Sequence, residues 1–180
     1  MARGGVALAV VLLVAAPVAQ AVDWQANQLR TPRQITVGPA DNAGASLAAD
    51  GTLYFERLRD QVPAVMAQAP GSARPRRLVP GSGDTRSPAA APADGRVALV
   101  SYAADARGDI CLTRPNQPGL DCLTEPGHTE RAPFWVDATH LGWLARPEVG
   151  APWSLVVRDL TDGSEQTLAE GALAAPTAGP

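Results

Sequence analysis

The stretch SPAAAPADGRVALV, residues 87–100, joins a proline-containing segment to a tight turn and an apolar strand. Asp94-Gly95 is a hairpin-turn signal, because glycine accepts the positive φ that such turns require. Residues 97–100 follow at once without a polar side chain, which is typical of a strand buried on both faces. This stretch therefore predicts a β-hairpin whose second strand lies deep in an all-β core.

The same pattern recurs along the chain with a period in the low forties. Asp50-Gly51 precedes an apolar strand at residues 53–55, and Asp137-Ala138-Thr139 precedes another at 141–144. A closing segment also recurs at positions 35, 78, 123 and 168, in steps of 43, 45 and 45 residues. This period is the length of one four-stranded propeller blade.

Each repeat also contains a later apolar strand, expected at residues 64–66, 110–112 and 155–157. The repeats span approximately residues 33–75, 76–120 and 121–165, and a partial repeat covers 166–180. The recurring aspartates and glycines are interpreted as turn positions and not as catalytic groups, because recurrence at the blade period marks structure. These turn positions are Asp50, Gly51, Asp94, Gly95 and Asp137.

The repeat resembles that of the TolB-like six-bladed β-propellers, which has Leu-Thr, a spacer, a Ser-Pro-Asp-Gly type turn and an apolar strand. Residues 87–100 carry the resemblance best, and Gly108-Asp109-Ile110 and Cys122-Leu123-Thr124 continue it over roughly residues 33–180. The third repeat departs from the pattern at Asp137-Ala138-Thr139. The resemblance implies an all-β chain of about three and a half four-stranded blades, an incomplete or N-terminal part of a larger six-bladed propeller.

The N-terminus has the three parts of a secretory signal peptide. Arg3 supplies the positive charge, residues 4–18 form an uncharged apolar run, and Ala19-Gln20-Ala21 is a small-x-small cleavage site. An uncleaved membrane anchor is the alternative, but the run is shorter than the ~20 residues that a spanning helix needs. We expect a signal peptide at 1–21, a lead-in segment at 22–32, and a periplasmic or secreted mature chain without a membrane span.

The charge balance argues against nucleic acid as a partner. All 15 basic residues are arginine, and the formal net charge is −3. Binding to phosphates normally requires a basic patch, and the arginine cluster at 74, 76 and 77 is divided by Pro75.

Cys111 and Cys122 are the only cysteines. In a hairpin centred between Asn116 and Gln117 they lie opposite each other, where Cβ atoms are close enough for a disulfide. An exported chain permits that bond, and two half-buried free thiols are the alternative. Their spacing fits neither a zinc site nor a redox CxxC motif.

No residue pattern indicates catalysis, a metal or a cofactor. The two histidines, His128 and His140, are too few for a metal site and are assigned structural roles. No Gly-x-Ser-x-Gly nucleophile motif occurs in the 180 residues. The sequence therefore predicts no catalytic, metal-binding or cofactor-binding residue.

The leading functional hypothesis is an exported, non-catalytic propeller module that binds a protein or peptide in the cell envelope. A rigid propeller gathers its loops at one end, which forms a recognition surface without requiring chemistry. The alternative is the N-terminal propeller portion of a prolyl-oligopeptidase-type serine peptidase, whose catalytic domain would follow residue 180. A glycan-binding or glycan-cleaving propeller would need clustered aromatic and acidic residues, which the sequence does not show.

Overall fold

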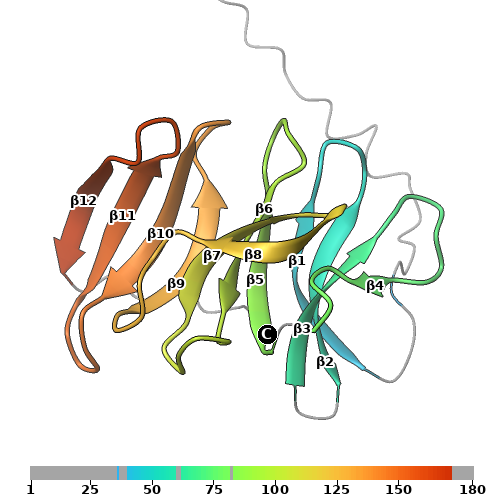
Figure 1. Cartoon of the computed structure of the whole chain (residues 1–180), viewed down its shortest axis with the longest axis horizontal. Helices are drawn as coiled ribbons and strands as arrows, with labels where there is room; N and C mark the ends of the chain where they lie inside the picture. Colours follow the sequence, from blue (N-terminus) through green and yellow to red (C-terminus); the bar gives the residue numbers. More distant parts are fainter. Residues whose placement is uncertain (1–35, 37–39, 60–61, 82, 172–180) are drawn as a thin grey trace, which may run out of the picture. The chain divides into compact units, whose positions relative to one another are not determined.

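The computed structural model describes residues 36, 40–59, 62–81 and 83–171, and every regular element among them is a β-strand. The described residues all belong to one compact unit, which begins at Ile35. The strands, shown in Figure 1, are β1 (Asp41–Leu47), β2 (Leu53–Arg59), β3 (Val62–Gln68), β4 (Arg76–Arg77), β5 (Thr85–Ala90), β6 (Val97–Ser101), β7 (Asp109–Arg114), β8 (Gln117–Cys122), β9 (Thr129–Trp135), β10 (His140–Arg146), β11 (Trp153–Asp159) and β12 (Glu165–Gly171).

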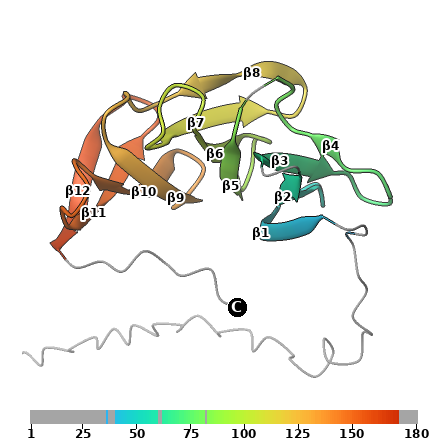
Figure 2. The same cartoon turned by 90° about the horizontal axis from the view of Figure 1, so that it is seen from below.

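Three antiparallel four-stranded sheets follow one another, with strand orders β1-β2-β3-β4, β5-β6-β7-β8 and β9-β10-β11-β12. We call them blades 1, 2 and 3. The first strand of each later blade contacts the blade before it: β5 packs on β1, β2 and β3, and β9 packs on β5, β6 and β7. Figure 2 shows β1, β5 and β9 on the inner side of the row and the last strands on its outer side, so the all-β propeller architecture expected from the repeat is confirmed.

The boundaries of the sheets lie one strand later than those of the sequence repeat. The segment at 166–169, which opens the partial fourth repeat in the sequence, lies in β12 and closes blade 3. A hairpin explains this, because the short β11–β12 connection makes the closing strand pair with its predecessor in the chain. Counted by sheets, the described residues form three blades, and residues 172–180 lie outside the described part.

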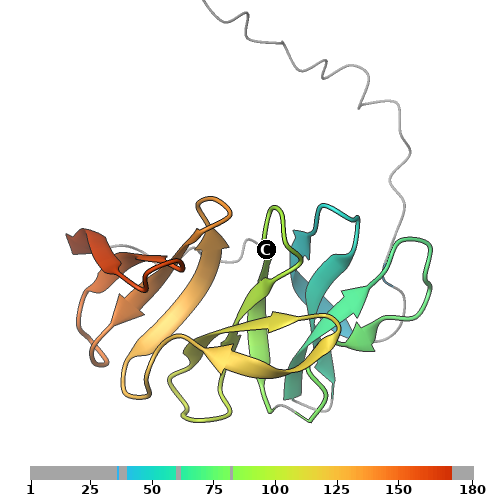
Figure 3. The ribbon, with the colours of Figure 1, turned by 45° about the horizontal axis from the view of Figure 1, so that its top comes forward.

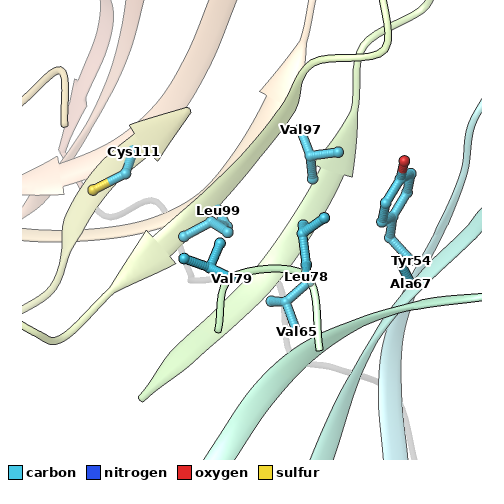
Figure 4. Close-up of a cluster of buried hydrophobic side chains, with 8 residues drawn as sticks. All are labelled: Tyr54, Val65, Ala67, Leu78, Val79, Val97, Leu99 and Cys111. Atoms are coloured by element: carbon cyan, nitrogen blue, oxygen red, sulfur yellow. The ribbon is translucent and has the colours of Figure 1, made fainter. Parts of the chain in front are cut away.

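Strand β6 shows why the centre of each blade is apolar. Its side chains alternate between the two faces of the sheet. Val97 and Leu99 pack against blade 1, and Figure 4 shows them facing Tyr54 and Val65. Ala98 and Val100 instead pack against Trp143 and its neighbours in blade 3. A central blade is covered on both faces, so its middle strands cannot alternate between apolar and polar residues.

Each blade also has a bulge in its first strand, at the same point of the repeat. The pairing register shifts between Ala43 and Ser46 in blade 1 and between Arg86 and Ala89 in blade 2, and also within blade 3. The bulged residue has left-handed backbone in all three cases. These residues are Gly44 (φ 56°), Ser87 (φ 52°) and Ala132 (φ 52°).

Two of the bulged residues carry side chains in a region that disfavours them. Pairing on both sides of the bulge holds them there, and the Ser87 N–H donates to Glu56 Oε1 of blade 1 at 2.7 Å. The Asp-Gly turns lie just beyond these bulged strands. Figure 3 shows the three blades side by side, with the β7–β8 hairpin in front of β5 and β6 of the same blade.

Candidate functional site

The predicted turn positions all lie in the connections between the first and second strands of the blades. These three connections occupy the same edge of the row, at the top of Figure 1. In each turn the aspartate accepts a hydrogen bond from the backbone N–H two residues later, which is an Asx-type turn. The pairs are Thr52 N to Asp50 Oδ1 (2.8 Å), Arg96 N to Asp94 Oδ1 (3.1 Å) and Thr139 N to Asp137 Oδ1 (2.7 Å).

The third turn lacks the glycine found after Asp50 and Asp94. It has additional contacts between His140 and Asp137 instead. The His140 N–H also donates to Asp137 Oδ1 at 2.8 Å, and the His140 ring Nδ1 lies 2.8 Å from Asp137 Oδ2. The hydrogen bond with Asp137 raises the pKa of His140 above its ordinary value. The backbone N–H of Thr139, followed by His140, holds the pKa of Asp137 well below its usual range. His140 thus stabilises a turn.

Two open grooves lie between the blades on the side of these turns. The groove between blades 1 and 2 encloses about 380 Å³ and is lined by Asp50, Arg76 and Asp94 among others. The groove between blades 2 and 3 encloses about 520 Å³. Arg114, at the end of β7, lines both grooves.

Arginines around these grooves connect neighbouring blades through backbone carbonyls. Arg76 of blade 1 donates to Pro115 O at 3.0 Å, and Arg96 of blade 2 donates to Ala138 O at 2.7 Å. Arg158 of blade 3 donates to Leu123 O at 2.7 Å. Because each guanidinium has several donors in a planar fork, it can connect blades and still face solvent.

Arg114 differs from these three arginines. Its side chain is exposed, and within the described chain its guanidinium makes a single hydrogen bond, a long one of 3.4 Å to Asp94 O. The larger groove beside it is lined by leucines together with polar residues, among them Gln117 and Asp121. The lining leucines are Leu112, Leu120, Leu123 and Leu160. This groove can therefore hold an apolar side chain next to an anionic group.

The other end of blades 2 and 3 is held together by loop contacts. Asp105, in the β6–β7 loop, accepts from the Gly127 N–H at 2.9 Å. Arg107 donates to Gly127 O and, at 3.3 Å, to Pro147 O in the β10–β11 loop. A cavity of about 250 Å³ lies beside these loops and is lined by His128 and Glu130 among others. The sequence does not distinguish Glu130, because a lone glutamate in a strand carries no motif.

Cys111 and Cys122 form the disulfide expected from the sequence. They are directly paired across β7 and β8, and Cys111 is fully buried in the core between blades 1 and 2. The position of the turn differs from the prediction. Arg114 pairs with Gln117, so Pro115-Asn116 forms the turn, and a bulge between Leu112 and Arg114 brings the cysteines into register.

Within residues 36, 40–59, 62–81 and 83–171, no three side chains of His, Cys, Asp or Glu lie close enough to hold a metal ion. That same part of the chain contains no helix of the length and apolar character needed to cross a membrane.

The fold is shared with solved structures of TolB. A TolB structure from Agrobacterium tumefaciens matches with a TM-score of 0.67 and 19% identity, over 78% of this chain and 53% of that one. TolB from Acinetobacter baumannii matches with a TM-score of 0.65 and 19% identity, over 76% of this chain and 34% of that one. The chain thus has a TolB-like β-propeller fold and spans about half and about a third of the lengths of these two proteins.

A propeller of this kind also occurs in peptidases. A structure from a study of two prolyl endopeptidases matches with a TM-score of 0.55 and 18% identity, over 74% of this chain and 20% of that one. No family model and no curated protein sequence matches this chain. At such low sequence identity, the structural similarity establishes the fold alone. The function must therefore be argued from the surface of the protein.

Proposed function

We propose that this protein is an exported, non-catalytic propeller module of the cell envelope that binds a protein or peptide. The observation that carries the proposal is the groove between blades 2 and 3, where the exposed side chain of Arg114 and four leucines line the same hollow. Concave sites that combine apolar walls with a few polar groups are typical of ligand binding. The TolB-like fold supports this role by analogy alone.

The chemistry of the groove favours a peptide segment in which a carboxylate lies next to an apolar side chain. Guanidinium binds carboxylate through two parallel hydrogen bonds, which are stronger than hydrogen bonds between neutral groups. The leucines that line the groove would contact the neighbouring apolar side chain. Arg96, which also lines the groove, is already engaged by Asp94 and the Ala138 carbonyl, so Arg114 is the group with free donors.

The test measures binding of a fluorescein-labelled Leu-Glu-Leu-Glu peptide and its Leu-Gln-Leu-Gln counterpart by fluorescence polarisation. We expect the acidic peptide to bind about tenfold more tightly, the size of one charge-assisted hydrogen bond. Arg114→Gln should remove this difference. Arg74→Gln, which changes an arginine outside both grooves, is the matched control. Equal binding of both peptides by the wild-type protein would refute the proposed ligand class.

Export is the second part of the proposal, and it rests on residues 1–21, which lie outside the described residues. We expect the mature protein to begin at Val22, because Ala19 and Ala21 occupy the positions that signal peptidase requires. Intact-mass measurement of protein from the periplasm or medium will show the new N-terminus. A product that retains Met1 would contradict cleavage.

The alternative function is the propeller portion of a prolyl-oligopeptidase-type serine peptidase. The structural match to a prolyl endopeptidase favours it specifically. Extending the reading frame beyond Pro180 distinguishes the two functions. A downstream Gly-x-Ser-x-Gly motif and hydrolysis of a proline-containing peptide by the full gene product would establish the peptidase.

A further inference from the structure

The inference concerns the contact between β9 and the third strand of blade 2. Glu130, near the start of β9, is only 4% exposed. Its Oε2 accepts a hydrogen bond from the Thr124 hydroxyl and a longer one, at 3.3 Å, from the Ile110 N–H, which also donates to Thr124 Oγ1 at 2.9 Å. One carboxyl group of blade 3 thus binds the backbone and the closing segment of blade 2.

The junction between blades 1 and 2 has a contact at the equivalent position, in which a hydroxyl takes the place of the carboxyl group. There the Val65 N–H donates to the Thr85 hydroxyl at 3.0 Å. Val65 and Ile110 are 45 residues apart in the sequence, as are Thr85 and Glu130, so the two contacts occupy equivalent positions. At Val65 the acceptor across the junction is a hydroxyl, which does not titrate, whereas at Ile110 it is a carboxyl group, which does.

A second carboxyl group lies near Glu130 in the same interior. Asp109, at the start of β7, is 2% exposed, and its Oδ1 has no hydrogen-bond partner in the described part of the chain. Its charge acts unfavourably on an ionised Glu130, as does that of Glu165 in β12. A carboxylate buried beside another carboxylate without a cation between them is costly.

The other charged groups around the junction are engaged elsewhere. Arg107 binds the carbonyls of the loops, and Arg146 lies 4.6 Å from the Trp153 ring centroid. Glu165 pairs with Arg158, and Asp105 accepts from the Gly127 N–H. His128, the remaining titratable group, lines the cavity next to Glu130. No ion pair to Glu130 is present among the described residues to stabilise its charge.

We propose that the packing between blades 2 and 3 is controlled by the proton on Glu130. The contact between β9 and β7 is stable while Glu130 is protonated and opens more readily when Glu130 is ionised. The equivalent contact between blades 1 and 2, from the Val65 N–H to the Thr85 hydroxyl, contains no titratable group.

The direction of the effect follows from proton linkage. Burial, opposed in part by the hydrogen bonds from Thr124 and Ile110, raises the pKa of Glu130 to about 7, from 4.5 for the ordinary group. Between these two values the folded protein holds a proton that the unfolded chain has released. Stability therefore falls as pH rises through this window and becomes constant above it.

The test measures hydrogen exchange at the amides of Ile110 and Val65 by NMR in the purified protein, at pH 5 to 8. Protection factors, corrected for intrinsic exchange, should fall at least tenfold at Ile110 and change less than twofold at Val65. Glu130→Thr, which copies the other junction, should abolish the fall at Ile110. Glu130→Gln serves the same purpose if the threonine variant does not fold.

Asp109→Asn separates the roles of the two carboxyl groups. Removing the Asp109 charge should move the transition at Ile110 to lower pH without abolishing it. Equal changes at Ile110 and Val65 in the wild-type protein would overturn the proposal. A transition that persists in the Glu130 variants but vanishes in Asp109→Asn would assign the pH dependence to Asp109. That result would also overturn the proposal.

Discussion

Replacing Trp143 by alanine should destabilise the protein by about 3–5 kcal/mol, the range measured for truncation of large aromatic residues in cores. Trp143 is 1% exposed and lies in β10 at the centre of the cluster that joins blade 3 to blade 2. Its neighbours there include Val100 and Ile110 of blade 2. The variant would leave a cavity between two blades that are rigid sheets and cannot close it.

Thermal and denaturant unfolding of the purified chain will measure the effect. The melting temperature should fall by roughly 10 °C, at about 2–4 °C per kcal/mol for a chain of this size. Trp153→Ala is the matched control, because Trp153 belongs to the same blade but is half-buried beneath Arg131 and Arg146. A loss at Trp143 no larger than at Trp153 would show that this cluster does not hold the blades together.

Removing the disulfide, with the double variant Cys111→Ala/Cys122→Ala, should cost about 3 kcal/mol. The bond closes a short loop, since the cysteines are 11 positions apart, and the chain-entropy relation assigns about this amount to such a loop. The Cys111 side chain is also fully buried in the cluster with Val97 and Leu99, so the variant loses packing between blades 1 and 2 as well.

Denaturant unfolding of the wild-type protein and of the double variant gives the difference in free energy. Reduction of the wild-type protein with dithiothreitol should reproduce most of it without any change of sequence. Thiol titration of the denatured, unreduced protein is the control for the bond itself and should detect no free thiol. Two reactive thiols per chain would show that the exported protein lacks the disulfide.

The repeat could be found from the sequence because its signals are local. A glycine after Asp50 or Asp94 marks a turn through its own backbone freedom, and the apolar run at 97–100 shows its burial through composition alone. The pairing of Cys111 with Cys122 was accessible for a similar reason, since two strands joined by a short hairpin have few possible registers. The sequence also contained enough signal to place His140 in a structural role.

The tertiary structure alone showed which groups meet across blades. Glu130 and Ile110 are 20 residues apart, and no local pattern distinguishes this glutamate from an exposed strand residue. The groove at Arg114 likewise depends on which of several arginines is engaged by carbonyls of the next blade.

The sequence by itself determined the period, the all-β class and the turns at Asp50, Asp94 and Asp137, because each depends on residues within one hairpin. Only the tertiary structure decided the groove beside Arg114 and the carboxyl contact at Glu130. The physical reason is that these features arise where one sheet packs on the next, and burial and hydrogen bonding between sheets depend on packing that no single repeat contains.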